Sequence, residues 1–259
     1  MRYIEEKDAE QIPGRPLSEN EQFAFACHPG ISCFNQCCRN LNLYLYPYDV
    51  IRLKNCLGIS SGAFIDTYTH VVLREGSFFP HVLLAMAEDA EKTCPFLTDE
   101  GCRVYPDRPQ TCRAFPVEQA VYFEEGKPRL LHYFRPPDFC RGREEACYWT
   151  VKSWEADQNA GFYNQMTVEW AEVLGLFPRD PWGAEGPYGQ KAKMAFMAVY
   201  NVDDFRQFVL ESSFFSRFKV KPDLRLKIKN DDVALFRLGL AWIKLMVFGI
   251  RTTQLSPKK

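Results

Sequence analysis

The stretch FACHPGISCFNQCC, residues 25–38, places four cysteines among small and turn-forming residues. A second stretch, CPFLTDEGCRVYPDRPQTCRAFP over residues 94–116, contains three more, and Cys140 and Cys147 follow it. Glycine, proline and asparagine between the cysteines favour turns over regular helices and strands. Turn-rich segments with this many thiols are typical of a chain that folds around a metal.

The composition of the whole chain is that of an ordinary globular protein. Its 259 residues suffice for one large domain or two small ones, and 46 % apolar residues exclude the disordered and collagen-like classes. The formal net charge of −1 gives no global field that attracts nucleic acid or an anionic membrane. The N-terminus has no apolar signal-peptide run, and the apolar stretch 233–250 contains two central charges. We therefore expect a cytoplasmic protein without a membrane span.

The pattern of apolar residues predicts an α+β fold. A small, irregular, metal-organised N-terminal unit with short strands and helices is expected to precede a mainly helical region. Residues 1–22 are predicted to form an irregular arm, 23–148 a cysteine-cluster metal-binding domain, and 149–259 a mainly helical C-terminal region packed on it. The boundary near residue 149 rests on the position of the cysteines, all ten of which precede it.

Individual elements follow from apolar periodicity and from turn residues. In the first part we expect two short helices over residues 49–57 and 60–72, a strand over 78–85 and a hairpin over 117–134. Pro80 restricts the strand to a sheet edge or makes it the start of a strand. In the second part we expect three helices and a hairpin with one basic face, over residues 149–174, 191–211, 233–250 and 217–229. The basic face lacks interleaved aromatic residues for base stacking, so nucleic acid is not an expected partner.

Eight of the ten cysteines are candidate metal ligands: Cys27, Cys33, Cys37, Cys38, Cys94, Cys102, Cys112 and Cys140. Adjacent residues point apart on a regular strand or helix, so Cys37 and Cys38 are not expected to serve one compact site without a distorted turn. We therefore expect the two cysteine groups to share a site, with two separate sites as the alternative. Cys56 and Cys147 are expected to be ordinary buried thiols.

The quoted residues carry a family resemblance. Cys33-x3-Cys37-Cys38, the following CPFL, CRVY and RPQTCRAFP runs, and the CRG at residues 140–142 resemble the YkgJ-like cysteine-cluster family. That family is described as a zinc- or iron-chelating CxxCxxCC domain, and it is related to the cysteine domain of flagellin lysine N-methylase. The spacing before Cys33 is wider than a strict CxxCxxCC, so Cys27 departs from the motif.

The resemblance implies a bound metal, and thiolate ligands suit zinc and iron–sulfur clusters alike. Because the cysteine spacing is irregular and the methylase domain implies iron, we expect a [4Fe–4S] cluster, with Zn²⁺ as the alternative. Three functions remain open: an iron–sulfur binding or electron-transfer protein, a structural zinc protein that engages a partner protein, and an S-adenosylmethionine-dependent protein lysine methyltransferase. A redox dithiol is disfavoured because the sequence has no Cys-x-x-Cys.

Two arginines in the RPQTCRAFP run, Arg108 and Arg113, match the family pattern. A guanidinium group near a thiolate-rich cluster neutralises its charge or donates hydrogen bonds to its sulfurs. We expect this supporting role for both residues. His28, next to Cys27, is expected to be a loop histidine, with metal ligation as the alternative.

Overall fold

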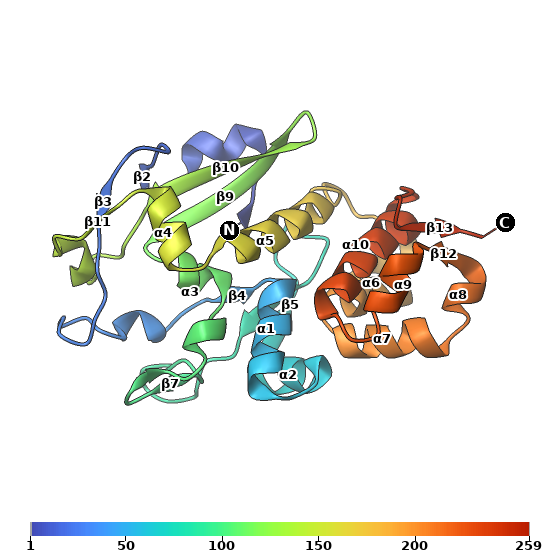
Figure 1. Cartoon of the computed structure of the whole chain (residues 1–259), viewed down its shortest axis with the longest axis horizontal. Coiled ribbons are helices and arrows are strands. Elements are labelled where there is room, and N and C mark those ends of the chain that lie inside the picture. The colour runs from blue at the N-terminus through green and yellow to red at the C-terminus, as the bar shows by residue number, and fades with distance from the viewer. Residues whose placement is uncertain (1, 259) are drawn as a thin grey trace. The chain divides into compact units, whose positions relative to one another are not determined.

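The computed structural model describes residues 2–258 and has the mixed α+β architecture predicted from the sequence (Figure 1). Two compact units divide the chain. The first contains the chain up to Tyr44 together with Leu84–Ala171, and the second contains Leu45–Leu83 together with the chain from Glu172 onward. Both units are discontinuous in sequence, so this division differs from the sequential arm, cysteine domain and helical region expected with a boundary near residue 149.

A four-stranded sheet in the order β1-β9-β10-β2 lies in the first unit. The predicted hairpin is present as β9 (Val117–Glu124) and β10 (Lys127–Phe134). Its turn residues, Glu125 and Gly126, both have positive φ, as a type I′ hairpin turn requires. Within the segment expected to be an irregular arm, β1 (Arg2–Tyr3) and β2 (Arg15–Pro16) flank the 3-10 helix η1 (Glu6–Gln11) and form the two edge strands.

Short helices and strands contain the cysteines of the first unit or lie between them. They are β3 (Phe23–Ala24), η2 (Gln36–Cys38), β7 (Leu97–Thr98), β8 (Gly101–Cys102), η3 (Tyr105–Asp107), α3 (Gln110–Ala114), η4 (Arg141–Glu144) and β11 (Tyr148–Trp149). The helix predicted over 149–174 is two helices, α4 (Val151–Asp157) and α5 (Gly161–Leu174). Asn159 adopts a left-handed φ of 52° between them, which interrupts the helical hydrogen bonding.

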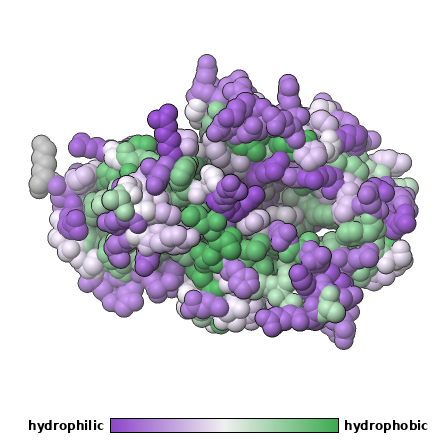
Figure 2. All heavy atoms as spheres, turned by 180° about the vertical axis from the view of Figure 1, so that it is seen from behind, coloured by the Kyte–Doolittle hydropathy of each residue, from purple (hydrophilic) through white to green (hydrophobic). Residues whose placement is uncertain are grey.

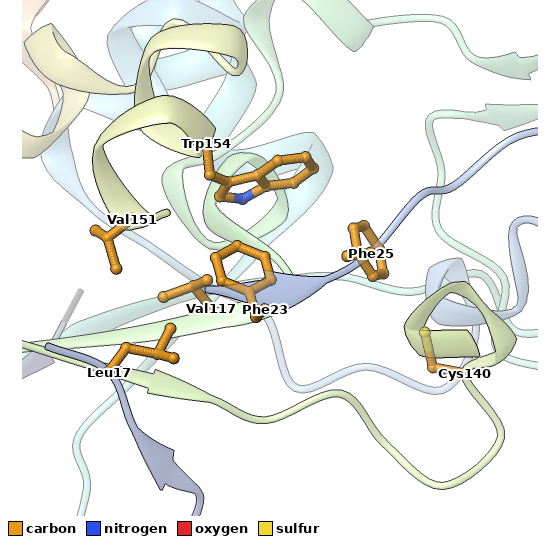
Figure 3. Close-up of a cluster of buried hydrophobic side chains, with 7 residues drawn as sticks. All are labelled: Leu17, Phe23, Phe25, Val117, Cys140, Val151 and Trp154. Atoms are coloured by element: carbon orange, nitrogen blue, oxygen red, sulfur yellow. The ribbon is translucent and has the colours of Figure 1, made fainter. Parts of the chain in front are cut away.

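Trp154 on α4 lies in the core of the first unit (Figure 3). Its ring meets Phe23 and Phe25 edge-on, with centroids 6.2 and 5.4 Å away, and its Nε1 donates a hydrogen bond to the Ala114 carbonyl at 3.0 Å. The same buried cluster contains Leu17, Val117, Cys140 and Val151. A candidate metal ligand, Cys140, is therefore held at the edge of an aromatic core.

The second unit is mainly helical. Its helices are α1 (Pro47–Leu57), α2 (Ser61–Tyr68), η5 (Gly183–Tyr188), α6 (Gln190–Val199), α7 (Val202–Glu211), α8 (Phe214–Arg217), α9 (Pro222–Lys227) and α10 (Asp232–Phe248). Small sheets accompany them: β4 (Tyr44–Leu45), β6 (His81–Leu84) and β5 (Thr69–Val72) pair in that order, and β12 (Phe218–Val220) pairs with β13 (Leu255–Pro257).

Helix α10 covers most of the stretch 233–250 predicted to be helical, and both of its ends are capped. The Asp231 side chain accepts hydrogen bonds from the amides of Val233 and Ala234, and Gly249 ends the helix with a φ of 69°. Gly239 allows α10 to approach α6 closely, because a Cβ there would lie 2.0 Å from the Ala198 carbonyl oxygen. The helix predicted over 191–211 is divided into α6 and α7.

The hairpin expected over 217–229 is wrong. Only Phe218–Val220 is extended, and its partner strand is Leu255–Pro257. Pro222 takes the first position of α9, where its fixed φ and missing N–H favour a helix start. The alternation of cations and apolar residues therefore comes from a strand followed by a helical turn, not from two strands.

No helix within residues 2–258 is long and apolar enough to cross a membrane. On the face shown in Figure 2, hydrophilic residues surround hydrophobic ones gathered near its middle.

Candidate metal centre

The first cysteine loop is a series of tight turns in the first unit. The carbonyl of Cys33 accepts a hydrogen bond from the Gln36 amide, and the carbonyl of Asn35 accepts one from the Cys38 amide, both at 3.0 Å. Asn35 itself has a left-handed φ of 61°, which begins the 3-10 turn that carries Cys37 and Cys38. The backbone thus reverses direction between one thiol and the next.

The pKa of Cys38 lies far above its usual range, mainly because its thiol interacts with the neighbouring thiol of Cys37. Burial and the charge of Cys37 raise it further. Both residues lie in a 3-10 turn after a left-handed residue rather than in a regular strand or helix, and such a distorted turn is what one compact site would need. Two adjacent ligands for one site are therefore sterically available.

The two cysteine loops meet at Cys38 and Cys94. The Cys94 amide donates a hydrogen bond to the Cys38 carbonyl at 2.9 Å, and Arg39 and Thr93 form an antiparallel bridge beside it. Burial raises the pKa of Cys94 to about 11, and nearby thiolate charge at Cys38 and Cys102 adds to that rise. The pairing of β7 with β8 brings Cys102 back toward Cys94. Thiols 37, 38, 94 and 102 therefore lie in one neighbourhood.

A second thiol group consists of Cys27, Cys33 and Cys140. Burial, together with the nearby Cys33 thiol, raises the pKa of Cys140, and both residues are buried. Burial, followed by the charges of Cys33 and Cys140, raises the pKa of the more exposed Cys27. The charge of Cys38, from the first group, adds to the same rise in pKa.

Tight backbone packing holds the Cys140 segment against the start of the first loop. The amide of Ala26 donates a hydrogen bond to the Gly142 carbonyl at 3.0 Å. A Cβ at Gly142 would lie 2.5 Å from the Ala26 carbonyl oxygen and 2.8 Å from a ring carbon of Phe25. Only glycine allows this approach without a shift of the surrounding chain.

Arg108 and Arg113 are buried, and the hydrogen bonds of their guanidinium groups reach oxygen atoms at 2.6 Å. Arg108 donates hydrogen bonds to the Tyr105 carbonyl and to the Gln158 side chain. Arg113 donates to the backbone carbonyls of Pro106 and Gln158. Together they tie the second cysteine loop to the end of α4. Burial raises the pKa of Cys102, whereas the charge of Arg108 lowers it, as a nearby cation does for any thiol.

A buried polar network that the sequence did not indicate supports α3, which carries Cys112. Glu155 Oε1 accepts hydrogen bonds from Gln119 Nε2 at 2.9 Å and from Asn164 Nδ2 at 2.7 Å. Gln110 on α3 donates to the side-chain oxygens of Gln119 and Asn164. These residues come from four elements and form no sequence motif, so only the fold reveals their association.

Three cysteines lie outside these two thiol groups, and one of them is the predicted ligand Cys112, which is half-buried on α3. Cys56 belongs to α1 in the second unit and is exposed rather than buried. Cys147 is half-buried, and its carbonyl accepts a hydrogen bond from the Phe25 amide. His28, the loop histidine, lies 3.6 Å from a Glu145 carboxylate oxygen, and its Nδ1 accepts a hydrogen bond from Gly30.

The donor chemistry of the site fits a thiophilic metal, because several adjacent thiols surround the junction of the loops and no disulfide joins them. Among residues 2–258, no three Cys, His, Asp or Glu side chains already form a group that could hold a metal ion. Binding would therefore require thiols to lose protons and rotate toward a common point.

Comparison with protein families decides the assignment of this segment. Residues 26–157, about half of the chain, match the family model CxxCxxCC, described as "Putative zinc- or iron-chelating domain". The chain belongs to the CxxCxxCC family. The matched residues of this CxxCxxCC protein include all eight candidate ligands and both arginines. No curated protein and no solved structure was found to match the chain.

Proposed function

We propose that this CxxCxxCC protein holds a [4Fe–4S] cluster through four thiolates drawn from both cysteine loops. The favoured ligands are Cys37, Cys38, Cys94 and Cys102. The observation that carries the proposal is the junction at Cys38 and Cys94, where a 2.9 Å backbone hydrogen bond joins the loops. A [4Fe–4S] cluster takes four cysteine ligands, which this neighbourhood supplies without a histidine or carboxylate.

The surroundings support iron–sulfur chemistry. Four thiolates give the bound cluster a net negative charge, and the nearby Arg108 guanidinium offsets part of it. Cys27, Cys33, Cys112 and Cys140 are the alternative ligands. A bound cluster would let the protein accept and donate electrons, whereas zinc would only cross-link the loops. A reducing compartment keeps so many thiols from forming disulfides, and we therefore place the protein in the cytoplasm.

The test is purification without oxygen, followed by metal analysis, sulfide analysis and a visible spectrum. We expect iron and acid-labile sulfide in similar amounts and broad visible absorption. Stoichiometric zinc in a colourless protein would contradict the proposal and would favour a structural zinc protein that engages a partner. Alanine at both Cys94 and Cys102 should abolish the absorption, whereas alanine at Cys56 should leave it intact.

A further inference from the structure

Positive charge is concentrated at one end of the second unit. Residues 217–229 and 251–258, which we call the basic segment pair, contain eight Lys or Arg and a single Asp. The chain as a whole has a formal net charge of −1, so the rest of it is acidic. The two parts of the pair lie together, because β12 pairs with β13 and the Lys221 amide bonds the Gln254 carbonyl at 3.1 Å.

These cations are not neutralised by the fold. Within residues 2–258, none of the eight forms an ion pair, and all eight are exposed. The nearest acidic residues in sequence are engaged elsewhere: Asp231 caps α10, and Asp232 pairs with Lys54 and Arg206. Like charges this close repel one another, and an anionic surface would relieve that repulsion.

An apolar residue lies among the cations. Leu226 on α9 is 72 % exposed and stands between Arg225 and Lys227, whereas Ile228 in the following turn is fully buried. The ring of Phe215 is covered by Arg225, whose guanidinium carbon lies 4.2 Å from the ring centroid. A leucine flanked by long cationic side chains suits the boundary between lipid headgroups and acyl chains.

From this charge and this exposed leucine we propose that the basic segment pair docks on anionic phospholipid bilayers. Lys219, Lys221 and Lys227 would contact headgroup phosphates, and Leu226 would enter the boundary region. A single-stranded nucleic acid fits less well, because its bases stack on exposed aromatic rings, and Phe214 and Phe218 are buried here. The proposal is independent of the metal centre.

The test is co-sedimentation of the full chain with vesicles of phosphatidylcholine, alone or with about 30 % phosphatidylglycerol. We expect binding only to the anionic vesicles, and its loss in about 0.5 M salt. The double variant Lys219→Glu/Lys227→Glu should bind more than about twentyfold more weakly, since each basic residue near the surface strengthens binding several-fold. Leu226→Ser should weaken binding several-fold without changing its salt dependence.

The matched control is Lys127→Glu/Lys152→Glu, which changes the net charge equally at exposed positions in the first unit. It should bind as the unchanged chain does. Equal binding to both vesicle types, or equal losses in both double variants, would overturn the proposal. Single-stranded RNA is also added to the vesicle-bound protein. If it displaces the protein at a phosphate concentration below that of the lipid, the proposal is overturned in favour of a nucleic-acid surface. Circular dichroism confirms that each variant is folded.

Discussion

The backbone amide of Arg141 donates a hydrogen bond to the sulfur of Cys33 across 3.1 Å, and 108 positions of sequence separate the two residues. Burial and the charge of the same Cys33 thiol raise the pKa of the neighbouring Cys140. An amide that points at a ligand sulfur stabilises it in one position and, in iron–sulfur proteins, tunes the cluster potential. The segment after the hairpin is therefore part of the same thiol neighbourhood as the first loop.

Replacing a thiol at the junction of the loops should remove metal. Cys38→Ser and Cys94→Ser are each expected to lower metal content and folding yield, because metal binding and folding are coupled in thiolate sites. The same result is predicted for Cys37 and Cys102, whereas Cys33→Ser and Cys112→Ser should lower metal content only through the folding of the two loops. Cys56→Ser, in the second unit, is the control and should keep full metal content. Metal per chain after purification without oxygen measures the effect, and loss at Cys56 with retention at Cys94 would refute the grouping.

Replacing Gly142 should separate the Cys140 segment from the first loop. Its missing Cβ leaves room for the Ala26 carbonyl and the Phe25 ring. Gly142→Ala is expected to lower the free energy of unfolding by about 2 kcal/mol, the usual cost of overpacking a close contact. Gly161→Ala, at the first residue of α5 with no atom near its added Cβ, is the control and should be neutral or slightly stabilising. Equal urea midpoints for both variants would refute this account.

The sequence predicts those features of the chain that depend on local chemistry. The 117–134 hairpin and the cysteine-rich loops follow from turn residues and apolar periodicity. The 217–229 segment was mispredicted because a strand followed by a helical turn can show the same alternation as two strands. The 3-10 turn that carries Cys37 and Cys38 could not be predicted either, since it depends on the left-handed Asn35.

Replacing the guanidinium group of Arg113 should destabilise the second cysteine loop. Its two nitrogens bond the carbonyls of Gln158 and Pro106, and its plane covers Tyr163, with the guanidinium carbon 4.2 Å from the ring centroid. Lysine cannot make both bonds, so Arg113→Lys is expected to cost about 2 kcal/mol in unfolding free energy. Arg103→Lys, at an exposed arginine of the same loop, should cost less than about 0.5 kcal/mol. If Arg103→Lys lowers the unfolding free energy as much as Arg113→Lys does, the two hydrogen bonds of the Arg113 guanidinium group are unimportant for stability.

Acid should weaken the second unit through Asp203. Its carboxylate accepts hydrogen bonds from the Ser61 amide at 2.7 Å and from Lys54 at 3.1 Å. Burial alone would raise the pKa of Asp203, but these hydrogen bonds outweigh burial and hold the pKa below its usual value. A carboxyl whose folded pKa is depressed stabilises the fold above its unfolded pKa of about 3.9, and this contribution is lost as the pH falls through the folded pKa.

Asp203→Asn should therefore lower the free energy of unfolding by about 1 to 2 kcal/mol at neutral pH, an estimate reduced for partial solvent screening. The difference from the unchanged chain should shrink as the pH falls below about 4, because protonation removes the same charge from Asp203. Urea unfolding monitored by helical circular dichroism, at several pH values between about 7 and 3, measures both effects. Asp223→Asn, at an exposed carboxyl on α9, is the control and should change neither. A difference between the Asp203 variant and the unchanged chain that stays constant down to the lowest pH would show that the stabilisation does not come from the ionised carboxylate.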